Sequence, residues 1–162
     1  MITYSDTAFV KAPASEIINW FLEMDEEQYM NWHKDHKAFR LVNETKGVGR
    51  TCYSEEYLGS FLLKATYKLT VLFENRFLIF ELGFPFSLLK GTCHFKLEEQ
   101  ADGTVMTALI TLGGKFDLFD PFIQKIMNKF LFKDESLLSH TKEEREYINE
   151  LFAERNTNSI NS

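Results

Sequence analysis

Two side chains that can bind a metal ion or move a proton stand four residues apart near the C-terminal end, His140 and Glu144. If residues 134–155 form a helix, Glu144 falls in the middle of a narrow apolar stripe that contains Leu137, Ile148 and Leu151. His140 lies one turn earlier, at the edge of that stripe. A charged carboxylate in apolar surroundings is unfavourable unless a cation pairs with it. The spacing therefore predicts that Glu144 meets either a cationic side chain or a metal ion.

Further candidate ligands lie upstream, in two short segments. The octet 29–36 is rich in aromatic residues and ends in His33 and His36, and an acidic pair, Glu55 and Glu56, interrupts a strand-like segment. Zinc sites combine imidazole and carboxylate ligands from separate elements, so these segments could meet the C-terminal helix. Strand alternation points one glutamate of the pair inward, and the pattern leaves open which one.

These residues need a scaffold, and the order of predicted elements indicates one. An opening strand over 3–11 precedes a helix capped by Ser15 and a short helix over 26–32 capped by Asp25. The strands that follow are expected over 50–58, 61–73, 76–84, 91–99 and 105–112, and the helices after them over 122–130, behind an Asp120–Pro121 cap, and 134–155. This order predicts an α+β fold of the helix-grip (START/Bet v 1-like) type. In it, a curved antiparallel sheet wraps around the long C-terminal helix and encloses a cavity.

Composition limits the classes of function. The 162 residues suit a single helix-grip domain over 1–155, followed by a polar tail over 156–162. A net charge of −6 without Lys/Arg clusters argues against nucleic acid. The absence of an apolar run near about 20 residues argues against membrane insertion. The N-terminus lacks a secretory signal pattern, and Cys52 and Cys93 are expected to be reduced thiols in a cytoplasmic protein.

The segments with candidate ligands also resemble a known family. Residues 29–36, Tyr-Met-Asn-Trp-His-Lys-Asp-His, resemble the Tyr-x-x-Trp-His-Pro-x-Asp-His signature of the diacetylphloroglucinol hydrolase family, which includes phloretin hydrolase. Residues 49–59, 91–95 and 140–144 are similar to further segments of that family, in the same order. The resemblance covers most of the chain from Tyr29 onward, and that family has the helix-grip fold.

The resemblance implies a metal centre and a reaction. It implies a zinc ion bound by His36, Glu56, His140 and Glu144, and a substrate hydrogen bond from Tyr29. In that family the zinc polarises a ketone on an acylated phenol ring, and the site hydrolyses the carbon–carbon bond to the acyl group. A proton donor is also required, and His94 or His33 is the candidate by residue type.

Two departures from the family pattern leave alternatives open. His33 and His36 are one residue closer together than in the signature, and lysine replaces its proline, so either histidine could be the ligand. Alternation also places His94 on the same strand face as Lys96 and Glu98, which would point it outward unless a bulge intervenes.

The leading hypothesis is a zinc-dependent hydrolase of a small hydrophobic ketone. The alternatives are a non-catalytic module that binds a small hydrophobic ligand or lipid in a cavity lined by Phe61, Tyr67 and Phe73, and a metal that only ties the helix to the sheet. The expected partner is a small hydrophobic or aromatic molecule, and the sequence is compatible with a homodimer.

Overall fold

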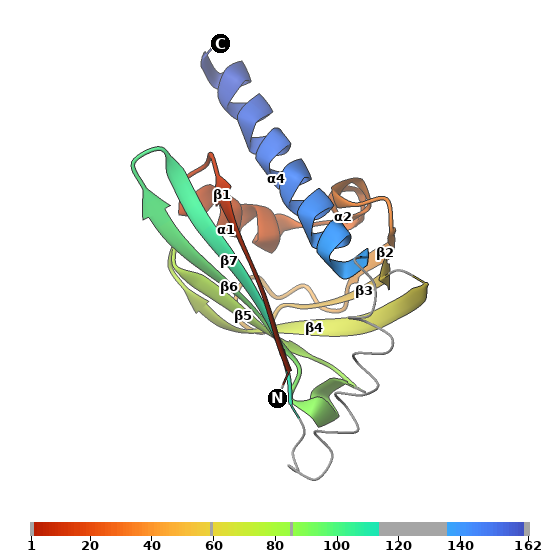
Figure 1. The fold of residues 1–162 in the computed structure, drawn as a ribbon. Coiled ribbons are helices and arrows are strands. Elements are labelled where there is room, and N and C mark those ends of the chain that lie inside the picture. The colour runs from red at the N-terminus through yellow and green to blue at the C-terminus, as the bar shows by residue number, and fades with distance from the viewer. Residues whose placement is uncertain (1, 59, 85, 114–135, 161–162) are drawn as a thin grey trace.

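The computed structural model describes residues 2–58, 60–84, 86–113 and 136–160. The predicted helix over 122–130 and its Asp120–Pro121 cap lie outside these residues. Figure 1 shows a curved sheet with the long helix α4 running along one side of it and the short helices α1 and α2 nearby. The α+β helix-grip prediction is confirmed by this arrangement.

The sheet has seven antiparallel strands in the order β1-β7-β6-β5-β4-β3-β2. Their bounds are β1 Ile2–Val10, β2 His36–Leu41, β3 Thr51–Leu58, β4 Phe61–Phe73, β5 Phe77–Leu82, β6 Thr92–Gln100 and β7 Gly103–Leu112. The helical elements are α1 Ala14–Glu23, α2 Glu26–Trp32, the 3-10 turn η1 Phe86–Leu89 and α4 Ser136–Ile160. Because β1 pairs with β7, the two short helices carry the chain from one edge of the sheet to the other.

The two short helices begin in different ways. Asp25 caps α2 as predicted, because its side chain accepts a hydrogen bond from Gln28 N at 2.8 Å and the Gln28 side chain accepts one from Asp25 N at 3.1 Å. For α1 the predicted cap, Ser15, is wrong, since the helix begins at Ala14 with Pro13 at the N-cap position. Ala14, the first residue of this helix, is fully buried and belongs to the hydrophobic core.

One strand departs from the alternation that its sequence predicts. The strand over 61–73 is confirmed, but its pairing with β5 shifts register between Leu69 and Val71. Leu69 is fully buried, whereas Val71 and Phe73 are exposed. The extra residue of a bulge reverses the facing of every later side chain, so Phe73, which the sequence analysis placed on the cavity wall with Tyr67, is exposed.

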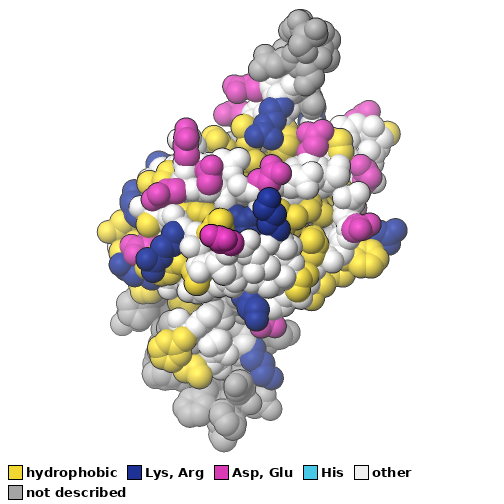
Figure 2. All heavy atoms as spheres, turned by 180° about the vertical axis from the view of Figure 1, so that it is seen from behind, with side chains coloured by type: hydrophobic (Ala, Val, Ile, Leu, Met, Phe, Trp, Pro, Cys, Tyr) yellow, Lys and Arg dark blue, Asp and Glu magenta, His cyan; other side chains and the backbone are white. Residues whose placement is uncertain are grey.

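The core joins α4 to the sheet and to the short helices. Ile148 and Phe152 of α4 are 1% and 0% exposed, and they belong to the same apolar cluster as Leu69 and Leu78 of the sheet. The helix continues beyond residue 155 to Ile160, since no glycine or proline interrupts it there. Among the described residues, no helix is both long enough and apolar enough to cross a membrane. On the face shown in Figure 2, cationic and acidic side chains are interspersed.

Candidate metal centre

His36 is the first residue of β2, shortly after the end of α2, and its ring is held in one orientation. Its Nδ1 lies 2.6 Å from the carbonyl oxygen of Tyr29, and the Tyr29 ring stacks on it with centroids 3.9 Å apart at 8°. A carbonyl oxygen only accepts hydrogen bonds, so Nδ1 donates and carries a hydrogen. Nε2 of this buried ring is thereby directed away from α2 and toward two carboxylates.

The first of these carboxylates belongs to Glu56, which lies opposite His36 in the register of β2 and β3. Glu56 Oε2 is 3.5 Å from His36 Nε2. Its neighbour Glu55 points to the other side of the sheet, where it accepts a hydrogen bond from Tyr53 and pairs with Lys64. Of the two glutamates that the sequence left as alternatives, Glu56 is therefore the one that faces the interior.

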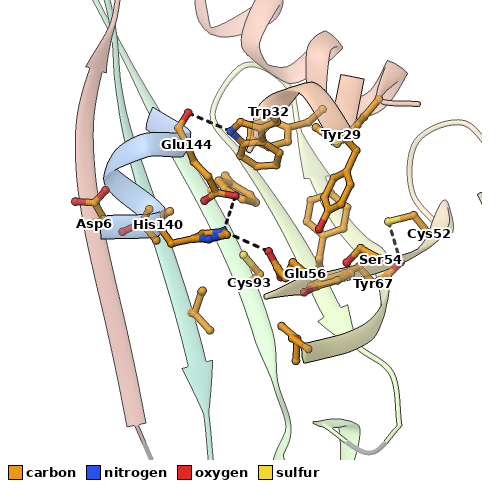
Figure 3. A pocket seen from close by; sticks show the side chains of 18 of the residues that line it. Asp6, Tyr29, Trp32, Cys52, Ser54, Glu56, Tyr67, Cys93, His140 and Glu144 are labelled. Carbon is orange, nitrogen blue, oxygen red and sulfur yellow. Dashed lines mark hydrogen bonds and ion pairs between the residues drawn. The ribbon is translucent and has the colours of Figure 1, made fainter. Parts of the chain in front are cut away.

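The second carboxylate and the second imidazole come from one face of α4. Glu144 Oε1 lies 3.1 Å from His36 Nε2 and 3.4 Å from His140 Nε2. His140 Nε2 also lies 3.5 Å from Glu56 Oε2. Figure 3 shows His140 and Glu144 of α4 pointing toward Glu56 of β3. Trp32 at the end of α2 donates a hydrogen bond from Nε1 to the Glu144 carbonyl at 3.1 Å, which holds α4 beside α2.

The four side chains form a compact cage, here called the His–Glu cluster (His36, Glu56, His140 and Glu144). One ligand atom from each lies within 4.8 Å of all the others. In a tetrahedral zinc site with bonds near 2.0–2.2 Å, neighbouring ligand atoms are about 3.3–3.5 Å apart. The four nitrogen–oxygen distances between the imidazoles and carboxylates, 3.1 to 3.5 Å, match that separation. The cluster therefore has ligand types and dimensions that fit a zinc ion.

Without a metal, the cluster is stable only as mutually paired charges. Burial lowers the pKa of each imidazole, but the adjacent carboxylates of Glu144 and Glu56 outweigh it and raise the pKa of His36 to about 9 and of His140 to about 10. Burial raises the pKa of Glu56, yet the adjacent imidazoles of His140 and His36 bring it down to about 2. The same contacts lower the pKa of Glu144. Two imidazolium ions then balance two carboxylates.

The hydrogen bonding of His140 is incomplete. Among the described residues, neither of its ring nitrogens has a hydrogen-bond partner with good geometry. Nδ1 lies 4.0 Å from Asp35 Oδ2, on the side away from the cluster. A buried imidazole without partners is unusual, and a metal ion at Nε2 would supply one.

His33, the alternative ligand, lies behind the cluster. Its ring packs against His140, with centroids 3.9 Å apart, and Nδ1 accepts a hydrogen bond from Asp35 N at 3.1 Å. Its Nε2 is 3.3 Å from Glu143 Oε2, and burial lowers its pKa. His33, Asp35 and His140 make a second, smaller group of potential ligands. His36 is thus the histidine of this motif that points at Glu56 and Glu144, and His33 does not line the cavity.

The cluster borders an apolar cavity of about 250 Å3 between α4, the short helices and the sheet. Glu56, His140 and Glu144 contribute to its wall. Most of the remaining wall is apolar, with aromatic rings from several elements: Phe21, Trp32, Phe39, Tyr67, Phe80, Phe86 and Phe95. Of the three residues predicted to line it, Tyr67 does so, whereas Phe61 and Phe73 do not. A metal in the cluster would face this space.

Tyr29 lies where it can contact a molecule in the cavity. Its side chain forms part of the wall, and its buried hydroxyl has no hydrogen-bond partner among the described residues. Burial, reinforced by the nearby charge of Glu56, raises its pKa, so the hydroxyl keeps its hydrogen. Tyr29 is therefore available to donate a hydrogen bond into the cavity.

The structure does not bring His94 to the site. Cys93 and Phe95 on either side of it line the cavity, and His94 lies on the other face of β6, where Nε2 is 2.9 Å from Thr92 Oγ1. No bulge reverses its direction, since β6 pairs with both neighbours in continuous register. Both cysteines are unpaired.

The sequence analysis did not single out Arg50, a charged residue of the cavity wall. Its side chain lines the cavity and is 7% exposed. The available signal was alternation along β3, which places Arg50, Cys52 and Ser54 on the same face as Glu56.

No protein-family model and no curated protein sequence matches this chain. Solved structures do. The chain is similar to Ara h 8.0201 (TM-score 0.60, 16% identity, 91% of this chain and 97% of that one). It is also similar to major latex-like protein 151 from Panax ginseng (TM-score 0.66, 11% identity, 93% and 97%).

A third similar structure is the di-domain ARO/CYC StfQ from the steffimycin biosynthetic pathway (TM-score 0.71, 12% identity). The match covers 96% of this chain and 52% of that one. At these identities the likeness concerns the backbone arrangement. Together with the seven-stranded sheet and the long C-terminal helix, it shows that this chain has the helix-grip fold of the Bet v 1-like structures.

Proposed function

We propose that this protein is a zinc-dependent hydrolase that cleaves a carbon–carbon bond next to the ketone of a small hydrophobic, acylated phenolic compound. The observation that supports it most is the His–Glu cluster, in which two imidazole Nε2 atoms and two carboxylates converge at tetrahedral spacing beside an apolar cavity. The ordered resemblance of residues 29–36, 49–59, 91–95 and 140–144 to the diacetylphloroglucinol hydrolase family supports the same reaction.

Charge balance supports a divalent ion. Two imidazolium ions and two carboxylates have no net charge, and neither do two neutral imidazoles, two carboxylates and one divalent cation. The cluster can therefore exchange two protons for a metal ion without leaving a buried charge uncompensated. The pairing of imidazole with carboxylate favours zinc over magnesium or calcium, which prefer oxygen ligands alone.

The chain's own residues supply the rest of the site. When bound, zinc would act as a Lewis acid that polarises the ketone oxygen of the substrate. The Tyr29 hydroxyl would donate a hydrogen bond to a substrate oxygen, since burial raises its pKa and it has no hydrogen-bond partner among the residues that the structure describes. The aromatic wall would bind the ring and exclude bulk water. His94 and His33, the proton donors expected from residue type, do not line the cavity, so the proposal gives neither of them that role.

Metal content tests the proposal directly. Protein purified without a histidine tag should contain about one zinc per chain by elemental mass spectrometry, and His140→Ala and Glu144→Ala should each remove it. Hydrolysis of acetylated trihydroxybenzenes, followed by release of acetate, should be lost in the same variants. Zinc-free protein that no added metal can load would refute the hydrolase.

A second candidate function is binding without catalysis, with the metal tying α4 to the sheet. The observation that favours it is the ligand count, because four protein ligands can fill a tetrahedral shell and leave no position for substrate. This candidate predicts stoichiometric zinc and ligand binding in the cavity, but no turnover of any acylated phenol. X-ray absorption spectra of the zinc protein with and without 2,4-diacetylphloroglucinol should separate the two, since only an open site changes its coordination.

A further inference from the structure

Arg50 is a buried cation on the wall of the cavity. Arg50 directly precedes β3, and the residue is 7% exposed. Nη2 donates a hydrogen bond of 2.6 Å to the carbonyl oxygen of Met24, the residue after α1. The guanidinium group has five N–H donors, and this contact uses one of them.

The other charged groups that line the cavity each have an oppositely charged partner. Arg145 pairs with Asp6 at 3.1 Å, and Glu56 and Glu144 pair with the two histidines of the cluster. Within the described part of the chain, Arg50 has no carboxylate within ion-pair distance. A buried guanidinium without a counter-ion is strongly unfavourable, and burial lowers its pKa accordingly. A ligand's acidic group would compensate it.

Arg50 and the His–Glu cluster lie at opposite ends of the same row of side chains. Arg50, Cys52, Ser54 and Glu56 all line the cavity from one face of β3, and Figure 3 shows Glu56, Ser54 and Cys52 following one another away from His140. Arg50 and Glu56 are six residue steps apart along extended chain, so their Cα atoms are separated by about 20 Å. Long side chains at both ends shorten the space between their charged groups.

We propose that Arg50 binds the carboxylate or sulfonate group of an amphipathic organic anion whose apolar body fills the cavity. Its planar fork matches such a group with two parallel hydrogen bonds. The aromatic wall contacts the body of the ligand, which extends along β3 toward the cluster. As a statement about the hydrolase substrate the inference rests on the proposed function, whereas the anion site itself does not require a metal.

Two fluorescent probes that differ only in a sulfonate test this site: 8-anilinonaphthalene-1-sulfonate and N-phenyl-1-naphthylamine. Binding is measured on the full chain, both zinc-loaded and after chelation. Arg50→Met should weaken binding of the sulfonated probe by about tenfold or more and change the affinity for the uncharged probe by less than about twofold. Arg50→Lys, which keeps the charge without the fork, should fall between wild type and Arg50→Met.

Lys68→Met is the matched control. Lys68 pairs with Thr51, the residue after Arg50, in the register of β3 and β4. Its side chain is exposed on the outer face of the sheet. It should leave the ratio of the two affinities unchanged. Equal weakening of both probes by Arg50→Met would overturn the proposal and leave Arg50 as a structural contact of Met24.

If Arg50→Met does not fold, as judged by circular dichroism, ligand displacement from the wild-type protein tests the proposal instead. Decanoate should displace N-phenyl-1-naphthylamine at a concentration about tenfold below that of decanamide. Equal potency would overturn the anion site. A preference for anions that disappears on chelation would also overturn it, because the metal would then be the anion's partner. If the protein proves to contain no metal, the preference for the anion should persist. A failure of the hydrolase proposal can therefore be distinguished from a failure of the anion site.

Discussion

Two neighbouring residues of helix α4, Glu144 and Arg145, connect it to the sheet, and their connections differ in kind. Glu144 enters the His–Glu cluster with β2 and β3, where the side chains of His36 and His140 are 0% and 4% exposed. Arg145 forms one ion pair with Asp6 of β1, at side-chain exposures of 28% and 29%. One connection is a buried network of four ionisable groups, and the other is a half-buried pair.

The difference shows what burial does to charge. In the cluster, every ionised group depends on the others, because removing one leaves the rest uncompensated in an apolar interior. At Arg145, water screens the pair, and loss of either partner is largely repaired by solvation. We therefore expect only the first connection to make the attachment of α4 sensitive to pH and to metal ions. The following predictions test this contrast in order of expected effect.

The largest effect is expected for Glu144→Ala. The change leaves two buried histidines with one carboxylate, so the free energy of unfolding of the metal-free protein should fall by about 3–5 kcal/mol at pH 6. Zinc should no longer bind at stoichiometric concentration. Urea unfolding followed by circular dichroism gives the first value and calorimetric titration the second. A loss below 1 kcal/mol would place Glu144 in the same class as Arg145.

Removal of the metal should produce the next largest effect. At pH 8, with zinc held near 100 times its dissociation constant, chelation should lower stability by about 2.7 kcal/mol. For a domain of this size, that corresponds to a drop in Tm of about 5–10 °C by differential scanning fluorimetry. Arg145→Ala should show the same drop and Glu144→Ala none. An unchanged Tm in the wild type would mean that the cluster does not hold the ion.

The metal-free and zinc-loaded proteins should respond to pH in opposite directions. The pKa values of His36 and His140 rise from 6.5 to about 9 and 10, so their contribution is complete below pH 6.5 and is lost as the pH rises toward 10. Glu56, with its pKa lowered from 4.5 to about 2, contributes fully above pH 4.5 and loses this contribution as the pH falls through 2.

In the metal-free protein, the contribution of the His–Glu cluster to stability should therefore be largest between about pH 4.5 and 6.5. Zinc must displace the protons of both imidazoles, so the stabilisation that zinc adds should grow from pH 6 to pH 9. Tm measured at each pH with and without zinc checks both trends. Parallel curves would contradict an exchange of protons for metal.

The smallest effect is expected for Arg145→Ala. Loss of this half-buried pair should lower the free energy of unfolding by about 0.2–1 kcal/mol and leave zinc content unchanged. The difference from wild type should shrink further in 1 M salt, where charges are screened within about 3 Å. A salt-independent loss of several kcal/mol would show that burial does not separate the two connections.

Parts of the fold and site were predictable because they rest on short-range patterns. The 3.6-residue period placed His140 and Glu144 together on the inner face of α4, and the two-residue period turned His94 outward. The strand over 61–73 has the predicted bounds, but its bulge after Leu69 was not foreseen. A bulge depends on pairing with β5, which a single strand does not encode.

The sequence by itself determined most of the elements, their order and the chemical types of the candidate ligands, whereas the strand β2 was not predicted. Tertiary structure decided which side chains meet. It selected His36 over His33, because the Tyr29 carbonyl fixes the His36 ring, and Glu56 over Glu55, because β3 is paired with β2 in one register. It also placed Arg50 in the cavity without a carboxylate partner among the described residues. Periodicity sets only the side of an element on which a residue lies, whereas contacts across 108 residues, such as His36 to Glu144, follow from how the elements pack.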